Sequence, residues 1–238
     1  MNVPAGIAEW RGKIAFAPMS ALFCGFGGIT PIHNTAAHKV IIGVRAIRSG
    51  GMQLDPRNPA IIPAGEAHSF DGRNQVIACA WLDARHYRLE DAASLADRWS
   101  QLAPSMDSID GLQEDIGKLS PRVLGKRLTR AMHAIEALPT IGAAANSVGL
   151  SESRFTHAVT DELGAPPRSW RRWLRLRRAI DLIASGYSVT AAAHEAGFAD
   201  SAHFSRICFS DLGLRPSALK TGQLKFRRSS ENCELNMI

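Results

Sequence analysis

Hydrophobic residues in the first third of the chain fall into short runs that turn-forming residues separate. Three runs, "HKVIIGVRAI" (38–47), "PAIIPAG" (59–65) and "QVIACAWL" (75–82), are rich in Val and Ile, and Gly, Pro, Asp and Asn stand between them. Several short strands at this spacing are typical of an antiparallel β-barrel or sandwich. We therefore predict a β domain over residues 1–86.

The pattern becomes helical after residue 86. The segment "RLEDAASLADRWSQLA" (88–103) places Ala92, Leu95, Ala96 and Trp99 three or four residues apart, which indicates a helix with one apolar stripe. We predict a helical linker over residues 87–118. Its stripe either packs on the β domain or serves as a dimerisation helix against a second subunit.

Everything after Ser120 has helical periodicity until the last residues. Ser120 and Pro121 form a good helix start, a capping hydroxyl before a proline that needs no N–H partner in the first turn. The following helix buries a face that includes Leu128 and Ile135, and Pro139 ends it. The final stretch is polar and lacks periodicity, so we predict a disordered tail over residues 223–238.

One pattern occurs twice in the helical part. "AAANSVGLSESRF" (143–155) and "AAAHEAGFADSAHF" (191–204) each combine three alanines, a glycine, a bulky apolar residue and a polar helix start. The two copies are offset by 48 residues at the alanines and by 49 residues at Phe155 and Phe204. A duplicated structural unit is the simplest explanation.

Each copy predicts two short helices joined by a turn. The first helices span 141–147 and 189–195, and each ends at a glycine, Gly149 or Gly197, that can adopt a left-handed conformation. A capping residue, Ser151 or Asp200, then opens the second helix. Small alanines let the two helices cross closely. This is helix-turn-helix geometry, in which the second helix enters the DNA major groove.

A long amphipathic helix lies between the two copies. In "PPRSWRRWLRLRRAIDLIASG" (166–186), Trp173, Leu176, Ile180 and Ile183 repeat at three and four residues. About five helical turns measure roughly 25 Å. Such a rod can present two recognition helices to successive major grooves, which lie about 34 Å apart on B-DNA.

Charge supports a polyanion partner for this half. The chain has a net charge of +6; residues 1–110 hold 10 basic and 10 acidic residues, whereas residues 111–238 hold 18 and 12. A basic half beside a neutral half suggests a nucleic-acid-binding module joined to a different domain. A solvated basic face without a partner is the alternative on charge alone.

Residues from about 120 to 220 resemble the DNA-binding domain of the AraC/XylS family of bacterial transcription regulators. The resemblance is carried by "GLSESRF" (149–155), "RLRRA" (175–179), "SVTAAAHEAGFADSAHFSR" (188–206) and "GLRPSALK" (213–220). It implies an all-α domain over residues 119–222 with two helix-turn-helix units joined by a long linker helix. It also implies cytoplasmic regulation of transcription, more often as an activator.

The resemblance places the base-facing positions on the second helix of each unit. They are Ser153, Thr156, His157 and Thr160 in the first unit, and Ser201, Ala202, His203, Ser205 and Arg206 in the second. Arg206 is the strongest candidate, because a guanidinium can donate two hydrogen bonds to guanine. A phosphate contact and an exposed, idle side chain are the alternatives for Arg206 and for the histidines.

Basic residues are dense on the linker helix. Six cations fall within eleven residues: Arg168, Arg171, Arg172, Arg175, Arg177 and Arg178. They distribute around a helix, so only some can face DNA. We predict that Arg171 and Arg172 contact phosphate, and that Arg175 braces the two units.

The β domain resembles, more weakly, the cupin-like β-barrel sensor domain that often precedes this DNA-binding domain. "IIPAGEAHSF" (61–70) is the main carrier, and His33, His38 and His68 are candidate effector-binding residues. A cupin metal site needs paired histidines and a carboxylate, and His33 and His38 are five residues apart without one between them. We expect no metal, no cofactor and no enzymatic activity.

Cysteine usage and hydropathy indicate the compartment. Four cysteines lie far apart without metal-finger spacing, so we expect reduced thiols. No secretory signal pattern and no apolar run of about 18 residues is present, so we expect a soluble cytoplasmic protein that does not enter membranes.

Three functions fit these observations. The first is a sequence-specific regulator that binds double-stranded promoter DNA, with a β domain that binds a small-molecule effector or forms a homodimer; an activator would also contact RNA polymerase. The second is a cupin-fold metalloenzyme tethered to DNA. The third is a nonspecific architectural DNA binder, whose affinity falls with salt and ignores sequence.

Overall fold

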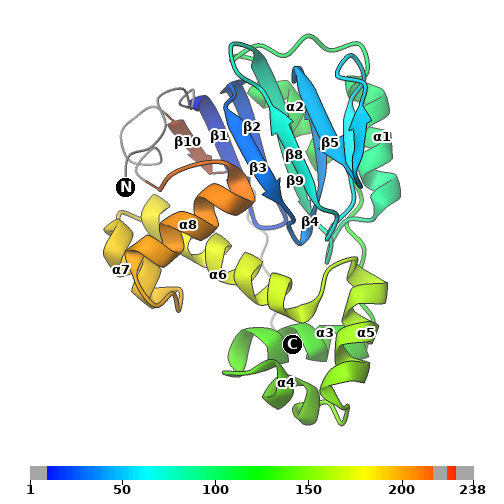
Figure 1. The fold of residues 1–238 in the computed structure, drawn as a ribbon, viewed down its shortest axis with the longest axis vertical. Helices are drawn as coiled ribbons and strands as arrows, with labels where there is room; N and C mark the ends of the chain where they lie inside the picture. The colour runs from blue at the N-terminus through cyan, green and yellow to red at the C-terminus, as the bar shows by residue number, and fades with distance from the viewer. Residues whose placement is uncertain (1–9, 217–223, 229–238) are drawn as a thin grey trace.

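The structure, a computed structural model, describes residues 10–216 and the backbone of residues 224–228. The β domain consists of two sheets (Figure 1). The larger has the strand order β10-β1-β2-β9-β4-β7, and the smaller has the order β3-β8-β5-β6. The strands are β1 (Arg11–Ala17), β2 (Ser20–Phe26), β3 (Ile29–His33), β4 (Ala37–Ile42), β5 (Ala46–Ser49), β6 (Met52–Leu54), β7 (Ala60–Ile62), β8 (His68–Asp71), β9 (Val76–Asp83) and β10 (Leu224–Arg228).

The larger sheet is buried on both faces, which explains the nearly continuous apolar runs of its strands. In β9, Cys79 and Trp81 point into one core, whereas Ala78 and Ala80 point into the other, as the two-residue period of a strand requires. All four side chains are buried.

Two details differ from the predicted barrel. The described strands pair within two separate ladders, so they form a sandwich rather than a closed barrel. The run 38–47 is also two strands, because Gly43 adopts a left-handed φ of +82° between β4 and β5. A Cβ there would lie 2.5 Å from the carbonyl oxygen of Val76, so the turn requires glycine.

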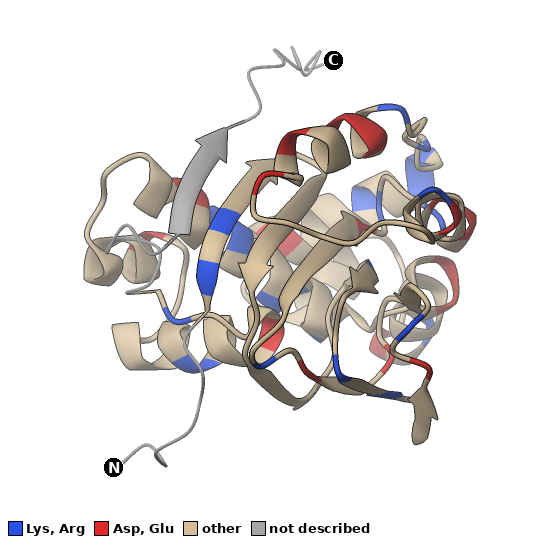
Figure 2. Ribbon diagram, turned by 90° about the horizontal axis from the view of Figure 1, so that it is seen from above, with Lys and Arg blue, Asp and Glu red and all other residues tan. Residues whose placement is uncertain are grey.

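Two helices cover the outer face of the larger sheet: α1 (Leu89–Trp99) and α2 (Ile109–Gly117). Leu95 and Trp99 of α1 are fully buried in the second core. The apolar stripe of the predicted linker therefore packs on the β domain, and it is not available to a second subunit. Both helices carry acidic residues in the first turn, and these are red in Figure 2.

The C-terminal part is all-α, as predicted. Its helices are α3 (Lys126–Ala137), α4 (Ile141–Ser147), α5 (Glu152–Leu163), α6 (Pro167–Ala184), α7 (Val189–Glu195) and α8 (Ser201–Leu212). The predicted helix start at Ser120 and Pro121 is wrong, because α3 begins at Lys126. The segment before it is held against the β domain instead, where the backbone N–H of Arg122 donates to the carbonyl of His86 at 2.6 Å.

Part of the predicted disordered tail is a β-strand. Leu224–Arg228 forms β10, which pairs in parallel with β1 at the edge of the larger sheet. The remaining tail residues, 223 and 229–238, lie outside the described residues. The end of the helical part thus returns to the β domain.

The two parts share one hydrophobic core. Buried residues of the sandwich, such as Phe23 and Trp81, belong to the same cluster as Trp173 and Phe204 of the helical part. Figure 1 shows α6 and α8 against one end of the sandwich, with α3 and α4 further away. Cys24, Cys79 and Cys208 are buried free thiols, and Cys233 lies outside the described residues. No helix in the described part of the chain is long and apolar enough to cross a membrane.

Candidate nucleic-acid interface

The first predicted helix-turn-helix unit forms as expected. Helix α4 begins at its N-cap Thr140, whose side chain accepts a hydrogen bond from Ala143 N at 3.0 Å. After α4 the N–H of Leu150 donates back to Ala145 O at 3.0 Å, across the left-handed Gly149. Ser151 then caps α5. The helix bounds 141–147 predicted from the sequence are confirmed.

The second unit repeats these bonds. Ser188 caps α7 by accepting from Ala191 N at 3.0 Å, and Asp200 caps α8 by accepting from His203 N at 2.6 Å. Between the two helices the N–H of Phe198 donates to Ala193 O at 2.9 Å. This bond is the counterpart of the one from Leu150 to Ala145 in the first unit. The duplicated sequence therefore folds into duplicated local structure.

A hollow of about 520 Å³ lies between the two units on one side of α6. It is lined by Glu152 at the start of α5, by His203 in the first turn of α8, and by arginines of α6. The N-terminal ends of both recognition helices thus border the same hollow. Both ends therefore lie on the same side of α6.

The predicted base-facing residues of α5 differ in exposure. Ser153 and His157 are exposed, whereas Thr156 and Thr160 are half-buried. The hydroxyl of Thr160 donates to the carbonyl of Thr156 at 2.7 Å, so it is engaged within the helix. On the opposite face, Phe155 and the residues one and two turns later are buried.

In α8 the outward positions are Ala202 and Arg206, which are both exposed. Ser201, His203 and Ser205 are half-buried. The hydroxyl of Ser205 donates to Ser201 O at 2.8 Å, and the His203 ring packs edge-on against Phe198, with ring centroids 5.5 Å apart. In α8, Arg206 is therefore the base-facing candidate with an exposed functional group.

Arg171 and Arg172, predicted to contact phosphate, both line the hollow, and both also have intramolecular partners. Arg171 donates to three carbonyls around the end of α3, those of Ile135, Leu138 and Pro139, at 2.9–3.0 Å. Arg172 forms an ion pair with Asp211 of α8, with 2.9 Å between Nε and Oδ2, and also donates to Asn34 of the β domain. These two side chains hold the structure together in this conformation.

Two other arginines of α6 line the hollow as well. Arg168 has an 85% exposed side chain and lies 3.8 Å from Glu152. Arg175 also lines the hollow, beside the turn glycine Gly197. Because hydrogen bonds to residues of other elements distinguish Arg171 and Arg172 from these two arginines, the sequence alone could not separate the two pairs.

Two of the three candidate effector-binding histidines meet in the β domain. His33 Nε2 and His68 Nε2 each lie 2.8 Å from the ammonium of Lys39, which is fully buried. The Nδ1 atoms of both rings face carbonyl oxygens, of Pro31 and Glu66, so Nδ1 carries the proton and Nε2 accepts from Lys39. Sequence patterns gave no indication of Lys39, which stands in an apolar strand.

His38 lies apart from this pair, and its Nδ1 accepts a hydrogen bond from Ala64 N at 3.0 Å. Burial lowers the pKa of His33 to about 3, of His38 to about 4 and of His68 to about 2. Burial likewise lowers the pKa of Lys39 to about 8. No group of three or more His, Cys, Asp or Glu residues that could hold a metal is found among the described residues.

Comparison with known proteins agrees with the geometry. A family model described as a helix-turn-helix domain matches residues 144–222. The chain is 28% identical over 156 residues to the Escherichia coli "Bifunctional transcriptional activator/DNA repair enzyme Ada", which covers 64% of this chain and 44% of that protein. It is 29% identical over 83 residues to the Salmonella typhimurium "Regulatory protein ada", covering 35% and 24%.

The chain thus spans less than half the length of the curated relatives that it matches. Among solved structures, ToxT from Vibrio cholerae aligns with a TM-score of 0.48 at 10% identity, over 83% of this chain and 96% of that one. The matched helix-turn-helix domain and the similarity to Ada agree with the resemblance found in the sequence. Over its helix-turn-helix domain, the chain is thus similar to DNA-binding transcription regulators of the AraC/XylS family.

Proposed function

We propose that this protein reads two successive major grooves of promoter DNA, one with α5 and one with α8. The observation that carries the proposal is the hollow between the two units, which both recognition helices border with their N-terminal ends. Base contacts come from the exposed residues Ser153 and His157 in the first unit and Arg206 in the second. The phosphates between the two grooves pass over the hollow.

Arg168 and Arg175 are the phosphate contacts in this proposal. Both line the hollow, and within the described part of the chain the 85% exposed side chain of Arg168 has only Glu152, 3.8 Å away, as an ion-pair partner. Phosphate contacts supply affinity and register, whereas base contacts supply the choice of sequence. Arg171 and Arg172 are not assigned phosphate contacts in this proposal, because hydrogen bonds to α3, α8 and the β domain hold their guanidinium groups.

The regulator acts as an activator in this proposal, and it therefore contacts RNA polymerase. The support is the similarity to a protein named as a transcriptional activator. The β domain receives a small-molecule effector or a second copy of the chain. An effector at His33 or His68 would have to displace Lys39 from their ring nitrogens, because these nitrogens are occupied.

Selection of bound sites from random DNA with the full chain tests the proposal. We expect a two-part motif whose halves are separated by about one helical turn, 10–10.5 base pairs. A single short motif would mean that one unit reads alone. Binding that ignores sequence and falls steeply with salt would instead indicate an architectural DNA binder.

A further inference from the structure

The two recognition helices end in the same way. Each has a glycine C-cap in the left-handed conformation, Gly164 after α5 and Gly213 after α8, and both have a φ of +73°. They are 49 residues apart, the offset that also separates Phe155 from Phe204. The duplicated unit therefore includes its C-cap.

Both C-caps press against the β domain. A Cβ on Gly164 would lie 2.7 Å from the carbonyl oxygen of Ala64, in the turn between β7 and β8. A Cβ on Gly213 would lie 2.5 Å from Thr30 Cγ2 and 2.8 Å from the ring of Trp10. At the first contact the two backbones meet directly, because a Cβ on Gly65 would overlap the carbonyl oxygen of Gly164.

The turn glycines of the same units offer a contrast. Gly149 has a φ of +72°, but nothing lies within 4 Å of a Cβ placed there. At Gly197 the nearest atoms belong to the Arg175 side chain, at 3.4 Å. Backbone conformation explains a glycine at all four positions, whereas contact with the β domain distinguishes Gly164 and Gly213.

Polar contacts reinforce the docking at the end of α8. The buried Lys39 ammonium lies 3.5 Å from the carbonyl oxygen of Asp211, in the last turn of this helix. A cation is favourable there, because the free carbonyls at a helix C-terminus carry partial negative charge. The Asp211 carboxylate is bound by Arg172, which also donates to Asn34 after β3. The ion pair is thereby tied to both domains.

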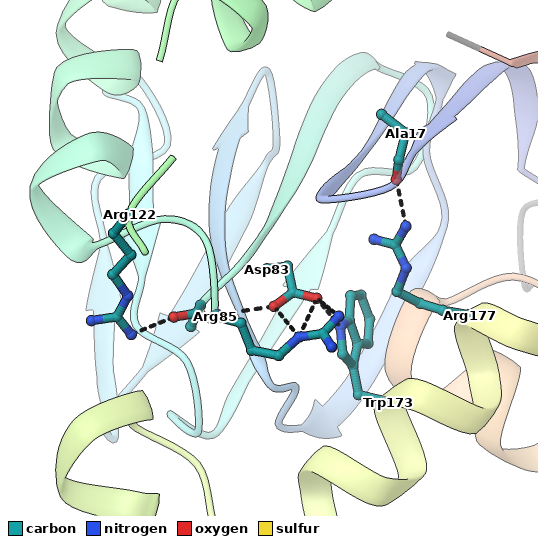
Figure 3. Close-up of polar contacts among 7 residues, drawn as sticks. Ala17, Asp83, Arg85, Arg122, Trp173 and Arg177 are labelled. Atoms are coloured by element: carbon teal, nitrogen blue, oxygen red, sulfur yellow. Dashed lines mark hydrogen bonds and ion pairs between the residues drawn. The ribbon is translucent and has the colours of Figure 1, made fainter. Parts of the chain in front are cut away.

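The linker helix α6, which lies between the two recognition helices in the chain, also contacts the β domain. Trp173 Nε1 donates to the Asp83 carboxylate at 3.4 Å, and Arg177 donates to the carbonyl of Ala17 (Figure 3). Burial alone would raise the pKa of Asp83, but the hydrogen bonds and charge of Arg85 hold it below its ordinary value. A buried carboxylate thus stays ionised at the end of β9. Arg122 joins Ala84 of the β domain to Glu162 near the end of α5.

We propose that the β domain acts as a rigid brace that sets the distance and angle between the two recognition helices. Gly164 and Gly213 are positioning residues in this mechanism, because they let the C-terminal end of each recognition helix reach the brace. The N-terminal ends stay free for DNA. The proposal rests on the proposed reading of two grooves, and it adds that the β domain determines which spacing between half-sites is accepted.

The brace predicts that the protein binds well only to DNA in which the two half-sites are separated by a narrow range of base pairs. One extra base pair between half-sites moves the second by about 3.4 Å along the duplex and turns it by about 34–36°. Two units joined by a single helix can follow part of this change by bending. Two units that are also docked at both far ends cannot follow it without breaking the contacts at Gly164 or Gly213.

The test compares glycine variants of the full chain on duplexes that carry the selected half-sites with spacers changed by one or two base pairs. Gly164→Ala and Gly213→Ala introduce a clash with the β domain. Gly149→Ala is the matched control, because it introduces the same backbone strain without a clash. Gly65→Ala introduces the clash with Gly164 from the β-domain side. Its matched control is Gly51→Ala, because Gly51 has a φ of +81° and nothing lies within 4 Å of a Cβ placed there.

We expect the unmodified protein and both controls to bind the duplex with the selected spacer about tenfold more tightly than duplexes with a changed spacer. For the three clashing variants we expect this difference in affinity to be less than about threefold. Hydrogen exchange at the amide of Gly65, which donates to Thr35 O at 2.7 Å, should accelerate in Gly164→Ala but not in Gly149→Ala. If Gly164→Ala fails to fold, Gly65→Ala decides the result, because it leaves the helix caps unchanged.

Two outcomes overturn the brace: clashing variants that keep the narrow preference, or controls that lose it equally. A chain that selects no two-part site at all overturns the proposed function instead. The hydrogen-exchange comparison still reports in that case whether the C-caps dock on the β domain. The two failures are therefore distinguishable.

Discussion

Arg206 and Arg171 belong to the same helix-turn-helix domain, but their surroundings differ. Arg206 projects outward from α8 and is exposed, whereas the guanidinium of Arg171 donates to three carbonyl oxygens around the end of α3. Residue type is the same, so burial and hydrogen-bond partners decide the role. Single substitutions should separate these roles cleanly.

Arg206→Ala should lower affinity for the selected site by about 1–3 kcal/mol and relax the preference at one base position, because a bidentate contact to guanine is lost. Binding assays on duplexes with each base substituted in turn would measure this. Arg178→Ala provides the control, since Arg178 is exposed on α6 and does not line the hollow. An equal loss on every sequence would make Arg206 a phosphate contact.

At the scale of elements, the different faces of helix α6 have different roles in the DNA-binding domain. Its buried face carries Trp170, Trp173 and Leu176, and the arginines at its margins contact α3, α8 and the β domain. Arg168 and Arg175 line the hollow together with Arg171 and Arg172. The helix therefore both braces the units and supplies charge to the DNA side.

Substitutions on α6 should accordingly split into two classes. Arg168→Ala should reduce the slope of log affinity against log salt by about 0.9 and leave stability unchanged, because one phosphate contact is lost. Arg171→Ala should lower the free energy of unfolding by about 1–2 kcal/mol, because carbonyls at the end of α3 lose a charged donor. Salt titrations and urea unfolding measure the two effects. The reverse pattern would assign the phosphate contact to Arg171.

At the scale of the whole molecule, the β domain and the helical domain share one core and a polar junction. Buried neutral histidines lie on the β-domain side of this junction. His38 accepts from Ala64, in the turn that contacts Gly164, and His33 and His68 surround Lys39 beneath α8. Protonation of these rings would disturb the surface on which the helical domain docks.

Stability should therefore fall in acid. Burial lowers the pKa of His33, His38 and His68 to about 3, 4 and 2, so below the ordinary value of about 6.5 the unfolded chain binds protons that the folded chain does not. Each histidine contributes at most about 1.4 kcal/mol per pH unit, and the loss begins as the pH falls below about 6.5.

Urea unfolding at pH 7.5, 6 and 5 would measure this dependence. His38→Gln should reduce the slope between pH 6 and 5, and the exposed His157 provides the control in His157→Gln. Stability that is independent of pH over this range would show that the rings are already accessible to protons in the folded protein.

The sequence by itself determined the local features of this protein. The double helix-turn-helix units, their caps at Ser151, Ser188 and Asp200, and the linker helix follow from periodicity and capping, which act within a few residues. The two cores of the β domain are formed by strands that are far apart in the chain. Only three stretches of strand were therefore predictable from the sequence. The helix start at Ser120 failed because a distant residue, His86, binds the backbone there.

Only the tertiary structure decided which arginines remain available to DNA, where the stripe of α1 packs, and that Gly164 and Gly213 touch the β domain. These properties depend on residues that are far apart in the chain and that folding brings within a few ångströms of each other. Periodicity can show that a side chain leaves the core of its own helix. It carries no information about which neighbour meets that side chain, because the neighbour belongs to another element.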